Sequence, residues 1–356
     1  MAKVQPLSTK GSQPRASSLD TAKRLLWATG MLPGLVALMI IGTIVSPAFL
    51  TGTNISNVLR ISAPLGLIAV GQTLVILSGR GGIDLSVGTV MAASAVVGAG
   101  FADQGLYAVV LASLLAGAFF GAINGLGVVT AGLQPFIATL ATFTIARGVG
   151  YELTQAQPII LNLPQLSYLA HGRLFGIPVP IVIVVIVLAV GQLILARTVF
   201  GRTLYAVGGN DEAAYASGVN VRAYRLAVYV ISGLLAGLAG VLGMAQLSTA
   251  DPNFGAGYEL EAIAAVVVGG AMLSGGKGTI VGTGIGVMIM ALVSNVLNLV
   301  NVNPWTHLMV TGLIVIVVVA VSGQREHSER DVRVMKGLPL YFGLLLGAGI
   351  LYGVLK

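Results

Sequence analysis

Cysteine is absent from the 356 residues of the chain. The protein therefore forms no disulfide and has neither a thiolate metal site nor a cysteine nucleophile. Charge is also scarce, because Lys, Arg, Asp and Glu together make up 9% of the residues, whereas a soluble domain carries roughly 25%. So few charges cannot cover a surface that faces water, and this excludes an ordinary soluble domain.

Long apolar runs take the place of the missing charges. The uncharged stretches 31–59 and 280–321 both exceed the roughly 20 residues that cross the hydrocarbon layer. Glycine is frequent, at 49 residues, and small residues let membrane helices approach closely. The sequence predicts an all-α, polytopic membrane helix bundle of about ten transmembrane helices. The predicted spans are 32–50, 58–79, 83–101, 106–130, 133–152, 178–197, 225–247, 259–276, 279–300 and 304–322.

Both ends of the chain differ in composition from the transmembrane domain, which is predicted at 29–323. Residues 1–28 are polar and rich in Ser, Pro and Lys, which predicts a disordered cytoplasmic tail. Residues 324–356 begin as a charged cytoplasmic segment and end in the apolar run 337–355. That run is long enough to form an eleventh span, and a position along the membrane interface or in packing against a neighbour is the alternative.

The distribution of basic residues predicts how the bundle is oriented. With a cytoplasmic N-terminus, the N-terminal tail, Arg80, the stretch 197–225, Lys277 and the segment 325–336 lie inside, and together they hold 15 of the 19 Lys and Arg residues. This is the bias expected of cytoplasmic loops. It accounts for the net charge of +7 without nucleic acid as a partner. Arg147 falls within a span, where it is expected either to pair with Glu152 or to extend toward the membrane surface.

Two glycine-rich segments interrupt the apolar pattern at predicted cytoplasmic ends of spans. Residues 81–89 read Gly-Gly-Ile-Asp-Leu-Ser-Val-Gly-Thr, and residues 269–279 read Gly-Gly-Ala-Met-Leu-Ser-Gly-Gly-Lys-Gly-Thr. They are interpreted as one element used twice. Internal repeats are common in transporters, in which the substrate path runs between two related halves.

The longest predicted cytoplasmic loop, 198–225, contains the pattern of a short helix. Asn210 suits the N-cap, Asp211 and Glu212 fall in the first turn, and Gly218 ends the helix. Ala213 and Ala214 leave a smooth face that another protein can approach. An ordinary solvated loop helix is the alternative interpretation.

The pattern of Glu212, Ala213, Ala214 and Gly218 resembles the coupling helix of permeases from ATP-binding cassette (ABC) importers. The resemblance is closest to the monosaccharide branch, the ribose and xylose type, and extends over about residues 55–323. Its more specific matches are 71–76, 82–88, 257–270 and 275–283. The chain departs from the general coupling pattern at 219–221, where Val-Asn-Val replaces a Leu-Pro step, and in the apolar run after residue 336.

This resemblance implies the protein's partners and location. It implies a multi-pass permease of the bacterial inner membrane, surrounded by lipid, that pairs with a second permease. A homodimer with another copy of this chain is expected, and a pseudo-dimer of two related chains is the alternative. Two ABC ATPase subunits would lie beneath it and a periplasmic sugar-binding protein above it. ATP and Mg²⁺ would bind the ATPase, and the permease itself would hold no cofactor or metal and would not be an enzyme. The residues expected to couple to the ATPase are Asn210, Asp211, Glu212, Ala213, Ala214 and Gly218.

Residues 271–278 do not form a nucleotide site of their own. A phosphate-binding loop needs Gly, four residues, Gly-Lys and then Ser or Thr. Here Ala271 stands at the first glycine position and Gly278 follows Lys277. Nor do the three histidines have the spacing of a zinc hydrolase.

Polar residues within the apolar spans are candidates for a substrate path, because sugar hydroxyls need donors and acceptors that release them again. Hydrogen bonding between helices is the alternative role for each of them. Asp84 also keeps a second function open, an ion-coupled secondary carrier, because a carboxylate in a bilayer can bind the driving ion. The path candidates are Asn57, Gln72, Asp84, Asn124, Thr139, Asn295 and Asn298.

Overall fold

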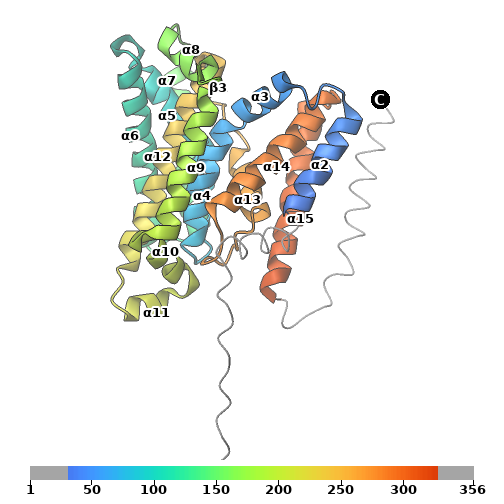
Figure 1. The fold of residues 1–356 in the computed structure, drawn as a ribbon. Coiled ribbons are helices and arrows are strands. Elements are labelled where there is room, and N and C mark those ends of the chain that lie inside the picture. Colours follow the sequence, from blue (N-terminus) through green and yellow to red (C-terminus); the bar gives the residue numbers. More distant parts are fainter. Residues whose placement is uncertain (1–30, 328–356) are drawn as a thin grey trace, which may run out of the picture.

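The computed structural model of the protein describes residues 31–327, most of which are α-helical (Figure 1). The predicted tail at 1–28 and the apolar run at 337–355 lie outside the described residues. The helices are α2 (Met31–Val45), α3 (Gly52–Ile61), α4 (Ala63–Leu77), α5 (Val87–Ala99), η1 (Ala102–Gln104), α6 (Leu106–Val129), α7 (Pro135–Thr154), α8 (Pro164–His171), α9 (Val179–Arg197), α10 (Val199–Gly209), α11 (Asp211–Ala216), α12 (Val221–Leu247), α13 (Tyr258–Val268), α14 (Ile280–Leu299) and α15 (Pro304–His327).

The prediction of a helical membrane bundle is confirmed, and every predicted span contains a helix. Within the described residues, α6, α9, α12 and α14 are each long and apolar enough to cross a membrane. The pair α3 and α4 adds a fifth crossing if it forms one span, which bends by 44° at Ser62. Helices α2, α5 and α15 contain shorter apolar stretches. The total of ten crossings therefore stays a prediction.

The span predicted at 32–50 ends at Val45, two residues before Pro47, which cannot continue a helix. Two other predicted spans extend beyond their helices into glycine-rich residues. Helix α5 begins at Val87 rather than at residue 83, and α13 ends at Val268 rather than at residue 276. The irregular residues are 78–86, here called the first glycine loop, and 269–279, the second glycine loop. Gly79, Gly81, Gly270 and Gly275 in these loops have φ between +66° and +97°. Glycine adopts this left-handed region without steric cost, and the helices stop there.

Helix α12 lies at the centre of the bundle, where it packs against α4, α5 and α6. Its contact with α6 is a contact between backbones. A Cβ added to Gly233 of α12 would collide with the carbonyl oxygen of Gly117, and a Cβ added to Gly117 would collide with that of Gly233. Small residues at such a crossing allow the closest helix packing in a membrane protein.

The two ends of the bundle carry different structures (Figure 1). At one end lie α3, α8 and the short strands. Strand β1 (Ile159–Ile160) pairs antiparallel with β4 (Thr249–Ala250), and β2 (Arg173–Leu174) pairs with β3 (Ile177–Pro178). At the opposite end lie α10 and α11. Arg60 and Arg173 thus lie at one end of the bundle and the basic stretch 197–225 lies at the other. This agrees with the predicted orientation, in which the stretch 197–225 is cytoplasmic and those two arginines are not.

Arg147 on α7 does not pair with Glu152, so that expectation was wrong. Its Nε donates to the hydroxyl of Tyr151 at 3.2 Å, and its guanidinium lies 5.6 Å from the centre of the Tyr151 ring. The Tyr151 hydroxyl in turn donates to Oδ1 of Asn253 at 2.7 Å. Tyr151 lies four residues after Arg147 and so shares its helix face, whereas Glu152, five residues after it, points in another direction.

Candidate functional site

The short helix predicted in the cytoplasmic loop is present as α11. The side chain of Asn210 caps it, because Oδ1 accepts a hydrogen bond from the backbone N–H of Ala213 at 2.9 Å. After α11 the chain turns at Gly218, whose φ is +83°. Asn220 then caps α12 through the N–H of Ala223 at 3.1 Å. Two Asn caps and one left-handed glycine therefore define the segment from 210 to 221.

Helix α11 presents a different face from the one predicted. Ala214 is 5% exposed and packs with Val207 and Val221 in a small core under the helix. The expectation that both alanines face another protein is therefore wrong for Ala214. Successive helical residues point about 100° apart, so burial of Ala214 turns Ala213 and Tyr215 outward. Tyr215, which is 75% exposed, was missed because its orientation depends on that packing.

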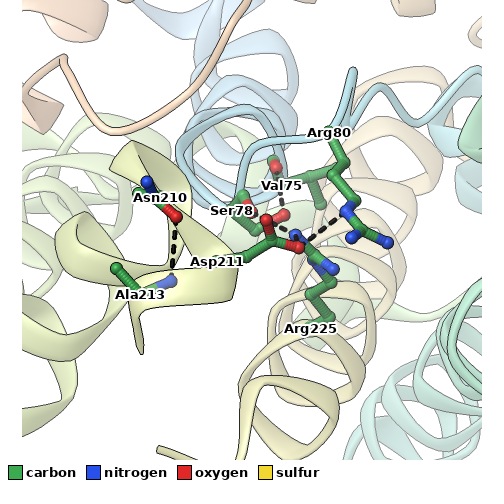
Figure 2. A network of polar contacts seen from close by, with 7 residues as sticks. All are labelled: Val75, Ser78, Arg80, Asn210, Asp211, Ala213 and Arg225. Carbon is green, nitrogen blue, oxygen red and sulfur yellow. Dashed lines mark hydrogen bonds and ion pairs between the residues drawn. The ribbon is translucent and has the colours of Figure 1, made fainter. Parts of the chain in front are cut away.

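An ion-pair cluster fixes the start of α11 to the rest of the bundle (Figure 2). Oδ2 of Asp211 lies 2.6 Å from Nε of Arg80 in the first glycine loop and 3.1 Å from Nη2 of Arg225 on α12. The same Nη2 lies 3.5 Å from the carbonyl oxygen of Ser78. We call Arg80, Asp211 and Arg225 the Asp211 clamp. Asp211 was predicted to couple to a partner, and here it joins α11 to α12 and to the end of α4.

Helix α10 is tied to the second glycine loop by Tyr205. The phenol donates a hydrogen bond to the carbonyl oxygen of Gly278 at 2.8 Å. Burial raises the pKa of Tyr205 above its ordinary value, so the phenol stays protonated and keeps donating this bond. Sequence patterns did not point to Tyr205, because nothing in the residues around a single tyrosine shows which distant residue it will contact.

A second polar cluster, the Asp84 network, is buried in the middle of the bundle. Asp84 is 1% exposed. Its Oδ1 accepts from the Ser86 N–H at 2.9 Å, from the Ser86 hydroxyl at 2.6 Å and from Asn124 Nδ2 at 3.3 Å. Its Oδ2 accepts from the Ser232 hydroxyl at 3.2 Å. Donors from the first glycine loop, α6 and α12 thus converge on one carboxylate.

Two further path candidates join this network through the backbone. With its amide oriented to satisfy both partners, Gln72 on α4 accepts from the Asp84 N–H at 3.2 Å and donates to the Asp84 carbonyl at 3.1 Å. Thr139 on α7 lies 3.4 Å from the carbonyl of Ile83. The structure therefore brings together Gln72, Asp84, Asn124 and Thr139. All four are buried and bonded to neighbouring segments, which favours helix packing over direct contact with a substrate for these residues.

The other three path candidates lie apart from the network. Asn295 on α14 forms a reciprocal pair with Asn54 on α3, at 2.9 and 3.0 Å. Asn57 and Asn298 are exposed. Their position in or next to predicted apolar spans was a weak signal, since it did not reveal which residues face the interior.

The arrangement defines the class of protein. Apolar helices long enough to cross a membrane form the bundle, two glycine loops interrupt them, and at one end α11 is bonded to the first loop and α10 to the second. This arrangement is consistent with a polytopic membrane permease, since interrupted helices are common in transporters. Residues 54–319 match the family described as "Branched-chain amino acid transport system / permease component". The chain belongs to this permease family.

Sugar permeases are among its relatives. The ribose import permease protein of Bacillus subtilis is 42% identical over 301 residues, which cover 83% of this chain and 93% of that protein. The D-allose transport system permease protein of Escherichia coli is 37% identical and matches 81% of this chain and 88% of its own length. The galactofuranose transporter permease protein of Escherichia coli is 37% identical, with 85% and 92% covered. No solved structure matches the chain.

Proposed function

We propose that this chain is the membrane-spanning subunit of an ATP-driven importer that carries a monosaccharide across the inner membrane of a bacterium. The observation that carries the proposal is the similarity to permeases for three different sugars over more than four-fifths of the chain. Ribose or a closely related sugar is the proposed substrate, because the ribose permease shares more identical residues with this chain than the other two do.

The proposed assembly follows from the two ends of the bundle. If the ten predicted spans all cross the membrane, α11 and the N-terminus both lie in the cytoplasm. The grouping of Arg80 and the basic stretch 197–225 at one end supports this orientation. Two ATPase subunits, which bind ATP and Mg²⁺, contact that end of a permease homodimer. A periplasmic sugar-binding protein contacts the other end.

In this proposal, the exposed face of α11 receives the ATPase. Glu212, Ala213 and Tyr215 form that face. Beside it lies an open hollow of about 1070 Å³, lined by the Asp211 clamp, Tyr215 and Arg222. Tyrosine and arginine are enriched at protein interfaces, and Tyr215 and Arg222 both line this hollow. Asp211 and Ala214 support the helix from beneath instead of touching the partner.

The Asp84 environment gives no support to an ion-coupled carrier. A driving ion needs access to the carboxylate and free acceptor positions on it. Four donor groups already occupy both oxygens of Asp84, and the residue is 1% exposed.

Uptake into proteoliposomes tests the proposed function. We expect the purified permease to import radiolabelled ribose only when its ATPase, internal ATP and external binding protein are all present. The energy source is then outside this chain, so a proton or sodium gradient should drive no uptake in their absence. Gradient-driven uptake by the permease alone would contradict the proposal and would favour the alternative function, an ion-coupled secondary carrier.

Gly218 provides a test of the α11 segment. Replacement by valine should lower ribose uptake by about fivefold or more, because a β-branched residue strains a left-handed turn by roughly 1–2 kcal/mol. A Cβ at this position would meet no neighbour, so the effect is one of backbone conformation alone. Gly218→Asn is the control, since asparagine visits this region readily, and its uptake should stay close to that of the wild type. Equal loss in both variants would contradict this explanation. Uptake is measured in cells whose own permease gene is deleted.

A further inference from the structure

Four glycines from three segments meet where α10 ends. Gly79 comes from the first glycine loop, Gly208 from α10, and Gly275 and Gly276 from the second glycine loop. We call this contact the glycine junction. The N–H of Gly276 donates to the carbonyl oxygen of Leu77 at 3.1 Å, so the second loop is bonded to the last turn of α4 at the same point.

No side chain fits within the junction. A Cβ on Gly208 would collide with the carbonyl oxygen of Leu77 and lie 2.6 Å from the nitrogen of Gly276. A Cβ on Gly79 would lie 2.9 Å from the oxygen of Gly208, and one on Gly275 would collide with the Cα of Gly79. The three backbones are therefore in direct contact, without a deformable side chain between them.

Helices α10 and α11, here called the coupling segment, are attached to both glycine loops by polar contacts on either side of the junction. The Asp211 clamp attaches α11 to Arg80 in the first glycine loop. Tyr205 attaches α10 to Gly278 in the second glycine loop. The segment that is proposed to touch the ATPase is thus bonded to both interruptions of the membrane helices.

Each loop leads from the junction into the interior of the bundle. The first carries Asp84 into its network with α6 and α12. The second leads into α14, where the hydroxyl of Thr283 lies 2.6 Å from that of Thr73 on α4. Close-packed backbone transmits displacement because it has little free volume to absorb it.

We propose that the glycine junction is the mechanical link between the ATPase-contacting helix and the transport path, and that α10, α11 and both glycine loops move as one body during transport. The identity of the driving partner rests on the proposed function. The rigid connection itself rests on the backbone contacts.

A matched pair of alanine variants in the complete importer tests the link. Gly208→Ala places a methyl group inside the junction, whereas a Cβ on the neighbouring Gly209 meets nothing within 4 Å. We expect Gly208→Ala to lower ATP-dependent ribose uptake by about tenfold or more, because overpacking against backbone forces the segments apart. The ATPase should still co-purify with this variant, which shows that the permease has folded. Gly209→Ala should transport within about twofold of the wild type, as surface substitutions usually do.

The outcomes separate the two proposals. A wild-type importer that shows no ATP-dependent uptake overturns the proposed function and removes the partner on which the link depends. A wild type that transports, together with a Gly208→Ala variant that transports equally well, overturns the glycine junction alone.

A reversible cross-link compares two states of the same folded protein, so a folding defect cannot explain a difference between them. Because this chain has no native cysteine, the reagent reacts within the permease only at the two introduced positions. Arg80→Cys combined with Asp211→Cys removes the ion pair and allows a short bis-methanethiosulfonate to join the same two segments. We expect uptake per ATP hydrolysed to be low in the reduced protein, to rise on cross-linking and to fall again on reduction. Cross-linked protein that is arrested, or that transports no better than the reduced form, would show that α11 and the first loop do not move together.

Discussion

Replacing Asp84 by alanine is expected to destabilise the protein so strongly that little of it stays folded. The substitution deletes the acceptor for the Ser86 N–H, two hydroxyls and the Asn124 amide in a buried site. Each buried donor left without a partner costs about 1–3 kcal/mol. Some donors will find another acceptor, so the expected loss is on the order of 3–5 kcal/mol, as for a broken buried ion pair. The quantity to measure is the temperature at which half the detergent-solubilised protein leaves the monodisperse peak in size-exclusion chromatography.

Asp103→Ala is the matched control, because this carboxylate is exposed in the turn before α6. Its effect should stay within about 0.5 kcal/mol. The thermal midpoint of Asp84→Asn should fall between those of the two alanine variants. Its amide oxygen can still accept from Ser86 and Asn124, while its NH₂ group faces the Ser232 hydroxyl. Equal midpoints for Asp84→Ala and Asp103→Ala would show that the network does not hold the first glycine loop in place.

The spans with uniform apolar composition could be predicted closely from the sequence. Helix α6 was expected at 106–130 and occupies Leu106–Val129, and α9 was expected at 178–197 and occupies Val179–Arg197. The helices beside the glycine loops could not. The sequence marks residues 81–89 and 269–279 as glycine-rich, but glycine also occurs inside helices of this chain, so composition does not show where a helix stops. The positive φ of Gly79, Gly81 and Gly270 shows where the backbone leaves the helical path.

The candidate sites show the same division between local and long-range information. The Asn210 cap is local, and the sequence predicted it. The burial of Ala214 depends on packing against Val207 and Val221, and the pairing of Asp211 with Arg80 joins residues that lie far apart in the chain. Gln72, Asn124 and Thr139 were predicted as substrate-path candidates because they are polar residues inside apolar spans, but the partner that each of them takes depends on packing.

The same alanine substitution is expected to have opposite effects at two helical glycines. Gly233→Ala should destabilise the bundle, because its methyl group meets the oxygen of Gly117 and lies 2.8 Å from the Cα and nitrogen of Gly121. Helices α6 and α12 must then separate along their closest contact, at a cost of about 1–3 kcal/mol. Gly148→Ala on α7 meets no atom within 4 Å. It should stabilise the protein by about 0.5–1 kcal/mol, since alanine favours a helix interior over glycine.

Whether each alanine variant is more or less stable than the wild type matters more here than by how much. The direction of the change separates a packing effect from a general loss of helix flexibility. Both glycines lie inside helices, so flexibility alone predicts a gain in thermal stability at both positions. Close contact between α6 and α12 predicts a loss at Gly233 only, and a larger loss for Gly233→Leu than for Gly233→Ala because the helices must move further apart. Thermal midpoints in detergent measure both variants on one scale. A Gly233→Ala variant as stable as Gly148→Ala would mean that the two helices do not meet backbone to backbone.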